Sequence, residues 1–226
     1  MKFIACVAAC GLLAGPAHAA VNLVVNGDFE AGDTGFTSDH TYVAPGDSVL
    51  YPEGLYTIAS NPISVHPYWI DIPDGSDMLI VNGKTGGIEP VVWQQAIDLA
   101  PGAYDFSAQA ANVCCNASFA GPNAASNLLF QYSFDGVNFA DLASIVTAPP
   151  GDAGMFYTVN GQIHTDTAQT VTLRVSNGVT AASGNDFALD NIMLTAVPEP
   201  QTWGLMIAGF GLAGLALRRG RRIAVA

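Results

Sequence analysis

Positive charge is scarce in this sequence. Among its 226 residues, seven are Lys or Arg and nineteen are Asp or Glu. Five of the seven cations lie at the two ends of the chain. The body between Ala20 and Val197 therefore carries only Lys84 and Arg174 against eighteen acidic residues, a formal charge of −16. A surface of this charge repels polyanions and favours solubility or divalent cations. Nucleic acid is thus excluded as a partner.

Cysteine is also rare, with four residues in the chain. Cys6 and Cys10 fall in the first nineteen residues, which have the pattern of a removable leader. The remaining pair, Cys114 and Cys115, are adjacent and cannot join distant strands, so burial rather than a disulfide framework must hold the body together. In an oxidising compartment we predict a vicinal disulfide between them. Two reduced thiols, or bonding between chains, are the alternatives.

The sequence lacks a catalytic constellation. Outside the leader the histidines are His40, His66 and His164, and none has the spacing of a zinc ligand or of a nucleophile-elbow motif. No glycine-rich phosphate loop occurs. Carboxylates are so common that no pair stands out as the acid and nucleophile of a glycosidase. We therefore predict a protein without enzymatic activity, with a hydrolase as the weakest alternative.

The N-terminus has the pattern of a secretory signal peptide. A cation at Lys2 precedes an apolar stretch, which is followed by small residues at Ala17 and Ala19. These are the three parts that the export machinery reads. We predict that the chain passes the Sec translocon and that signal peptidase removes residues 1–19, cutting before Ala20.

The C-terminus holds a short apolar segment with a basic end. The fifteen residues from Trp203 to Leu217 carry no charge, and arginines follow at once. A spanning helix usually needs about 20 apolar residues, so this is a marginal transmembrane segment. The arginines predict a cytoplasmic end, and Pro198 and Pro200 favour an extended stretch just before the span. We expect the precursor to be anchored in the inner membrane with its body outside.

A dense set of residues marks this tail. They are Pro198, Glu199, Pro200, Trp203, Gly209, Phe210, Gly211, Arg218, Arg219, Arg221 and Arg222. Together they resemble the PEP-CTERM sorting signal in its Trp-containing variant. The resemblance implies that residues 197–222 are a sorting signal cut by an exosortase in a Gram-negative bacterium that makes exopolysaccharide. The mature protein would then lie at the cell surface or outside the cell. An ordinary anchor that is never cut is the alternative.

The body between the two ends has the patterns of β-strands. Apolar and polar residues alternate in residues 104–108, 128–134 and 171–176, and this period predicts half-buried antiparallel strands. Turn dipeptides such as Asn26-Gly27 and Asn82-Gly83 recur between such runs. No helical stripe, internal repeat or long linker interrupts them. Residues 20–196 are therefore predicted to form one all-β domain, an antiparallel sandwich of the jelly-roll type.

Segments at both edges of the body carry a second resemblance. The body opens with NLVVNGDFE and closes with GNDFALDNIML, with MLIVNG and FQYSFDG between them. In this order they resemble the galactose-binding-like jelly rolls, which include many carbohydrate-binding modules. The resemblance implies a structural Ca²⁺ ion with Glu30 and Asp190 as acidic ligands. Backbone carbonyls of the turn from Asn26 to Asp28 could complete such an oxygen site. Alternatively, the two carboxylates cap turns or accept backbone hydrogen bonds.

One loop combines the residue types that hold sugars. Aromatic rings stack on a pyranose, and carboxylates and amides bond its hydroxyls. The segment SVHPYWIDIPDG supplies His66, Tyr68, Trp69 and Asp71 as candidate ligand-binding residues, with Tyr42 and Tyr51 nearby in the sequence. Packing under a long loop would equally explain Tyr68 and Trp69. Trp93 lies in a predicted strand and is interpreted as core.

The leading functional hypothesis is therefore non-enzymatic binding of carbohydrate, such as the exopolysaccharide of the cell. The alternative is an acidic structural or adhesion component of the biofilm matrix. Calcium would bridge such a component, which would need no defined sugar pocket.

Overall fold

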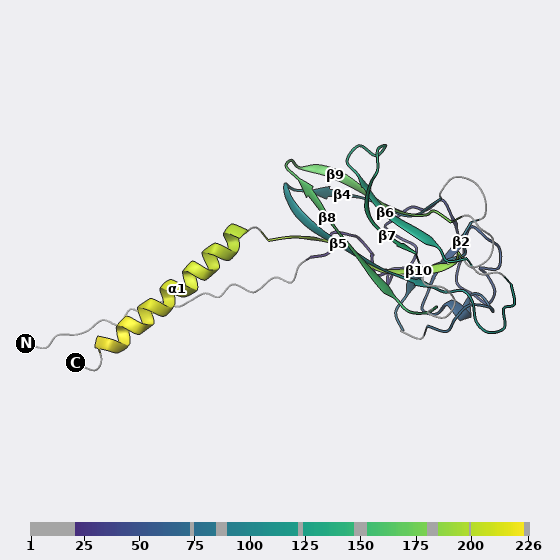
Figure 1. Cartoon of the computed structure of the whole chain (residues 1–226), viewed down its shortest axis with the longest axis horizontal. Helices are drawn as coiled ribbons and strands as arrows, with labels where there is room; N and C mark the ends of the chain where they lie inside the picture. The colour runs from purple at the N-terminus through teal and green to yellow at the C-terminus, as the bar shows by residue number, and fades with distance from the viewer. Residues whose placement is uncertain are drawn as a thin grey trace, which may run out of the picture.

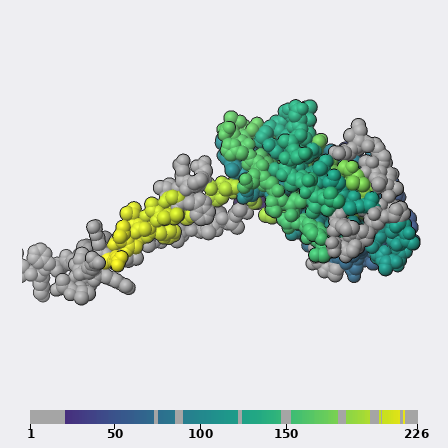
Figure 2. All heavy atoms as spheres, viewed as in Figure 1, coloured from purple at the N-terminus to yellow at the C-terminus, as the bar shows by residue number. Residues whose placement is uncertain are grey.

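The computed structural model describes residues 21–72, 75–84, 90–121, 124–146, 153–179, 185–198 and 200–223. The predicted signal peptide, residues 1–19, and Glu199 of the sorting signal lie outside these ranges. A β-sandwich makes up the body, and one C-terminal helix, α1 (Pro200–Ile223), projects from it (Figure 1). The filled-atom view in Figure 2 shows the same separation of α1 from the body.

Ten strands form the two sheets of the sandwich. The larger sheet has the order β1 (Thr41–Tyr42), β2 (Leu55–Ala59), β3 (Met78–Val81), β10 (Phe187–Ala196), β5 (Gly102–Asn112) and β8 (Tyr157–Thr165). The smaller sheet has the order β4 (Val91–Leu99), β9 (Gln169–Asn177), β6 (Asn127–Ser133) and β7 (Ala140–Val146). Neighbouring strands are antiparallel except β1 and β2, which are parallel. The predicted all-β sandwich is confirmed.

The alternating apolar residues identified in the sequence locate the core. Tyr104, Phe106 and Ala108 of β5 are buried on one face, as are the alternating apolar residues of β9. In residues 128–134 the pattern holds only partly, because β6 ends at Ser133 and Phe134 lies beyond it, partly exposed. There the Asp135 carboxylate accepts hydrogen bonds from the next backbone N–H groups and turns the chain. The strand therefore ends one residue before the apolar pattern does, because the hydrogen bonds of the following turn redirect the chain.

The main core lies between the sheets and includes Trp93, as interpreted from the sequence. A second, smaller core covers the opposite face of the larger sheet. In β3, Leu79 and Val81 belong to the first core, whereas Met78 and Ile80 belong to the second. Side chains alternate between the faces of a strand, so β3 is buried on both sides. The covering layer comes from the two segments on either side of β2, residues 43–50 and 62–72, together with residues 113–115 and Phe156. The second of these segments includes η1 (Pro62–Ser64).

The two edges of the body meet in space. The backbone N–H of Leu23 donates to the carbonyl of Leu194 at 2.9 Å, and the N–H of Ile192 donates to the carbonyl of Gly27 at 2.8 Å. A Cβ at Gly27 would overlap the Ile192 carbonyl oxygen, so this close approach requires glycine. These two hydrogen bonds hold the opening segment alongside β10.

Helix α1 forms where the transmembrane segment was expected. Pro200 is its first residue, a position where the missing N–H of proline costs no hydrogen bond. Within the described part of the chain, no helix has both the length and the apolar character that crossing a membrane requires. The uncharged run from Trp203 ends at Leu217, and arginines occupy the following turn.

Candidate functional site

A pocket of about 180 Å³ lies beside the second core, and we call it the aromatic pocket. Its lining residues come from five separate segments of the chain. They are Tyr51, Glu53, His66, Tyr68, Trp69, Asn82, Cys114, Cys115, Phe119 and Asp186. Rings, carboxyl groups, an amide and sulfur atoms are thus concentrated at one place.

The rings of the pocket contact one another in a continuous group. His66 stacks on Trp69 with a centroid distance of 4.5 Å, and Tyr51 stacks on His66 at 5.0 Å. Tyr68 lies edge-on to Tyr51 at 6.3 Å and contacts Phe119 at 5.8 Å. Trp69 is only 1 % exposed, whereas Tyr51 is 55 % exposed. The group therefore runs from a buried base at Trp69 to an open mouth at Tyr51.

Polar groups hold one side of the pocket. The buried Asn82 amide donates to the Leu50 carbonyl at 2.6 Å. The Asp186 carboxylate, also buried, accepts from the backbone N–H of Gly83 at 3.1 Å. The Asn82-Gly83 turn, recognised in the sequence only as punctuation, therefore joins two pocket residues. Glu53 is exposed and adds a second carboxyl group.

The protonation of the pocket follows from burial and from neighbours. Burial lowers the pKa of His66, so its imidazole is neutral at neutral pH. A hydrogen bond with Tyr68 raises the pKa of the Tyr51 hydroxyl, which therefore stays protonated. No Lys or Arg is among the lining residues, so the carboxyl groups of Glu53 and Asp186 set the charge of the pocket.

The segment after β5 closes the base of the pocket. Cys114 forms an isolated β-bridge with Trp69, and its N–H donates to the side chain of Asn112 at 2.8 Å. The sulfurs of Cys114 and Cys115 are joined as a disulfide in the structure. Its presence in the purified protein stays a prediction, which a count of free thiols tests.

Asn116 connects this segment to the aromatic loop. Its side-chain amide donates to the carbonyls of Pro67 and Trp69, both at 3.0 Å, and its backbone N–H donates to the Tyr68 carbonyl at 2.7 Å. Sequence reasoning gave Asn116 no role. The structure shows the role of its side chain, because it places the loop of residues 67–69, some fifty residues earlier in the chain, within hydrogen-bonding distance of Asn116.

The sequence-based site residues divide between two places. His66, Tyr68 and Trp69 lie together in the aromatic pocket. Asp71 does not line it: this exposed carboxylate accepts a hydrogen bond from the Asn61 side chain at 2.5 Å. Trp69 packs in the core and also lines the pocket: its side chain belongs to the second core and forms part of the pocket wall.

The sequence did not single out four of the lining residues. These are Glu53, Asn82, Phe119 and Asp186. They come from segments far apart in the chain, and none has a distinctive local pattern. No local signal could have found them.

The carboxylates proposed as calcium ligands accept backbone hydrogen bonds, the second of the two roles that the sequence allowed for them. Glu30 is exposed and accepts from the backbone N–H of Asp77 at 2.9 Å, while the buried Asp190 accepts from the N–H of Asn191 at 2.6 Å. Asp28 lines a separate surface hollow beside Asn191. Among the residues that the structure describes, no three His, Cys, Asp or Glu side chains converge on a metal position.

An amide occupies the turn that was expected to supply calcium ligands. The Asn26 side chain donates to the carbonyls of Gly32 and Thr34, at 2.8 and 2.9 Å. Its oxygen accepts from the N–H of Ala31 at 2.9 Å. These bonds close the loop that follows the Asn26–Asp28 turn and involve none of the carbonyls of that turn, so the calcium site stays a prediction.

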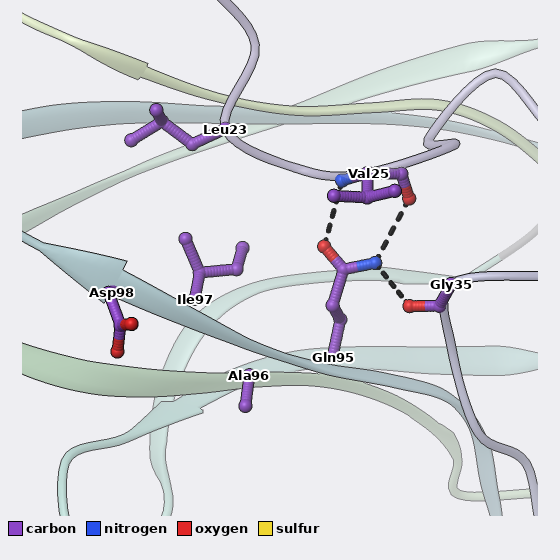
Figure 3. A pocket seen from close by; sticks show the side chains of 7 residues that line it. All are labelled: Leu23, Val25, Gly35, Gln95, Ala96, Ile97 and Asp98. Carbon is purple, nitrogen blue, oxygen red and sulfur yellow. Dashed lines mark hydrogen bonds between the residues drawn. The ribbon is translucent and has the colours of Figure 1, made fainter.

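Another hollow, of about 380 Å³, lies along the outer edge of β4 (Figure 3). The Gln95 side chain bridges the backbone of Val25 and Gly35 there, with bonds of 2.6 to 3.0 Å. Figure 3 shows that the remaining side chains are aliphatic apart from Asp98. With no ring and one carboxylate, this hollow has fewer of the groups that hold a ligand than the aromatic pocket has.

The tail has its own local geometry. The last backbone bond before it runs from the N–H of Val197 to the carbonyl of Ala103 at 2.8 Å. Helix α1 then begins at Pro200. Residues 196–222 match the family model described as the PEP-CTERM protein-sorting motif. The chain carries a PEP-CTERM sorting motif. A motif of this kind marks an exported protein.

Solved structures with a similar arrangement of strands include three sugar-binding domains. The CBM22-1 xylan-binding domain from Paenibacillus barcinonensis Xyn10C is 16 % identical, with 81 % of this chain and 99 % of that chain covered and a TM-score of 0.49. TmCBM61, solved in complex with β-1,4-galactotriose, is 14 % identical, with 79 % and 100 % covered and a TM-score of 0.47. A further CBM22 xylan-binding domain is 13 % identical, with 77 % and 95 % covered and a TM-score of 0.46.

All three TM-scores are below 0.5, so no ligand or residue role is transferred from these domains to this chain. Among curated proteins, none matches the chain.

Proposed function

We propose that the exported body binds carbohydrate through the aromatic pocket, without turnover. The observation that carries this proposal is the convergence of Tyr51, His66, Tyr68 and Phe119 around carboxyl groups in one pocket. A pyranose has an apolar face of C–H groups and an edge of hydroxyls. Rings beside hydrogen-bonding groups match those two parts.

The size of the pocket limits how much of a glycan it can enclose. Its volume of about 180 Å³ is below the roughly 300 Å³ at which sites for drug-sized ligands begin. One sugar unit is therefore the expected occupant, with the rest of a chain leaving through the mouth at Tyr51. Such a site recognises the end of a glycan or a side branch.

The sorting motif supports a location for this activity. We propose that an exosortase cuts the precursor near Pro198 and Pro200, and that the mature body meets its glycan at the surface of a Gram-negative cell or outside it. Exopolysaccharide is the candidate glycan. The mature chain would bind it as a matrix or surface protein.

Substitution at the pocket tests the binding proposal. A glycan array probed with the mature chain should give signals that Tyr68→Ala abolishes, because this ring contacts both Tyr51 and Phe119. Tyr42→Ala is the matched control, since Tyr42 is a partly exposed tyrosine that contacts Tyr56 away from the pocket. Glycan signals that survive Tyr68→Ala would contradict the proposal. Release of reducing sugar from a bound glycan would contradict binding without turnover.

The charge of the body favours one other function. A formal charge of −16 with only two cations suits an acidic structural or adhesion component that Ca²⁺ bridges between copies. Light scattering with and without added Ca²⁺ distinguishes the two functions. Calcium-dependent association of a chain that binds no glycan would favour this alternative.

A further inference from the structure

We propose that the sugar unit bound by the aromatic pocket carries a protonated amine, so that the ligand is a hexosamine unit. This rests on the proposed function and names the class of sugar within it. Three observations support it: the charge of the lining residues, the rings beside them, and the charge of the whole body.

The charged side chains among the described lining residues of the pocket are acidic. Glu53 and Asp186 line it, and no Lys or Arg does. His66 adds no positive charge at neutral pH, because burial lowers its pKa. Lys84 is not among the lining residues, and its side-chain stem lies against Gly54. The pocket is therefore an environment that favours a cation.

The rings strengthen this preference. A cation is attracted to the face of Trp, Tyr or Phe when it lies within about 6 Å of the ring centre. Tyr51, Tyr68, Trp69 and Phe119 surround a space large enough for one sugar, and their centroids are within 7 Å of their neighbours in the group. An ammonium group on a pyranose would contact ring faces and carboxylates at once. The same rings would still stack on its C–H face.

The other charge states of a sugar fit less well. A uronic acid would bring a carboxylate toward Glu53 and Asp186, and like charges in a partly desolvated site repel strongly. A neutral sugar would gain hydrogen bonds but no charge attraction. The remaining cation of the body, Arg174, cannot compensate, since it packs over the Phe139 ring at 3.6 Å and bonds Gln131 on the smaller sheet.

The experiment compares sugars that differ in one substituent. Calorimetric titration of the mature chain would use D-glucosamine, N-acetyl-D-glucosamine, D-glucose and D-glucuronate, together with D-galactosamine and D-galactose for the other configuration. We expect at least one amine to bind about ten-fold more tightly than its parent sugar and its acetylated form. Added NaCl should weaken binding of the amine and leave the neutral sugar unchanged.

Two variants locate the charge effect. Glu53→Gln should reduce the preference for the amine over its parent sugar several-fold, because it removes the negative charge and keeps the size of the side chain. Asp47→Asn is the matched control, an exposed acidic residue outside the pocket, and should change neither affinity. A preference that Glu53→Gln leaves intact while Asp47→Asn removes it would place the amine site elsewhere and overturn the inference.

The outcomes separate the inference from the proposed function. Equal or weaker binding of both amines relative to their parent sugars would overturn the inference and leave carbohydrate binding standing. Binding of glucuronate at least as tight as that of the amines would do the same. If neither these sugars nor the glycan array gives binding that depends on Tyr68, the proposed function fails together with the inference.

Discussion

Some residues of this protein belong to a core and also line the proposed binding pocket. Trp69 belongs to the second core and is also the base of the ring group in the aromatic pocket. Its buried position fixes His66, which stacks on it, and His66 in turn supports the more exposed Tyr51. A rigid base of this kind reduces the entropy that a ligand must remove from the rings on binding.

Asn116 links the segment after β5 to the loop that carries Tyr68 and Trp69. Asn116→Ala removes two donors, to the carbonyls of Pro67 and Trp69. We expect the free energy of unfolding to fall by about 1–2 kcal/mol and glycan binding to be lost. Urea denaturation and sugar titration measure the two effects.

Asn138→Ala is the control for that substitution. Asn138 is an exposed asparagine bonded to Asp135 in the turn after β6, and its loss should reduce stability slightly without affecting binding. Wild-type affinity in a folded Asn116→Ala protein would show that the amide does not position the pocket.

His40 predicts how stability depends on pH. Its imidazole is buried beside the backbone of Val91. Burial first, and the charge of Lys84 second, lower its pKa from 6.5 to about 4. The unfolded chain therefore binds more protons between these two values, and the free energy of unfolding should fall by roughly 3 kcal/mol as the pH drops from 6.5 to 4.

A substitution isolates this contribution. His40→Leu should flatten the decline in the free energy of unfolding measured between pH 6.5 and 4. His164→Leu should not, because His164 is 65 % exposed and only approaches Asp166 at 3.7 Å. An unchanged slope in His40→Leu would mean that another group titrates in this range.

At the scale of elements, the sandwich depends on how its opening segment meets β10. Gly27→Ala would place a methyl group on the Ile192 carbonyl, and backbone cannot move aside cheaply. We expect a loss of about 1–3 kcal/mol in the free energy of unfolding, measured by thermal or urea denaturation. Gly204→Ala, which adds the same methyl where α1 has open space, should be neutral or slightly stabilising. Equal stability of the two variants would show that the segment is not held as described.

At the scale of the whole molecule, the acidic body and the basic tail have separate roles. Intact mass of the mature protein, with its location in cell fractions, should show loss of residues 1–19 and of the tail from near Pro200. Release outward should depend on the exosortase. A strain lacking the exosortase is the control. An uncut tail in both strains would make this an anchored protein, and the link to exopolysaccharide would lose its support.

Much of this architecture could be predicted without the structure. The period-two patterns predicted β5 and β9, and the order of segments between Asn22 and Leu194 indicated the sandwich. These features are local, because side chains alternate in any strand and a turn is set by a few residues. The sorting motif was also local, and a family model matches it at residues 196–222.

The site could be predicted only in part. His66, Tyr68 and Trp69 share one loop, so their proximity follows from the sequence. Three further lining residues come from other segments of the chain: Glu53, Phe119 and Asp186. No local sequence pattern near them indicates that they line a pocket. Asp71 was predicted with the three loop residues, but its carboxylate lies outside the pocket and accepts a hydrogen bond from Asn61.

The sequence by itself determined the charge of the body, the sorting motif, and which faces of the long strands are apolar. These depend on composition and on spacing within short segments. The tertiary structure alone decided that β3 is buried on both faces, that one amide at Asn116 links two distant loops, and that rings and carboxyl groups share a pocket. Such pairings bring together residues far apart in the chain, and their geometry exists only once both sheets and the covering loop have packed.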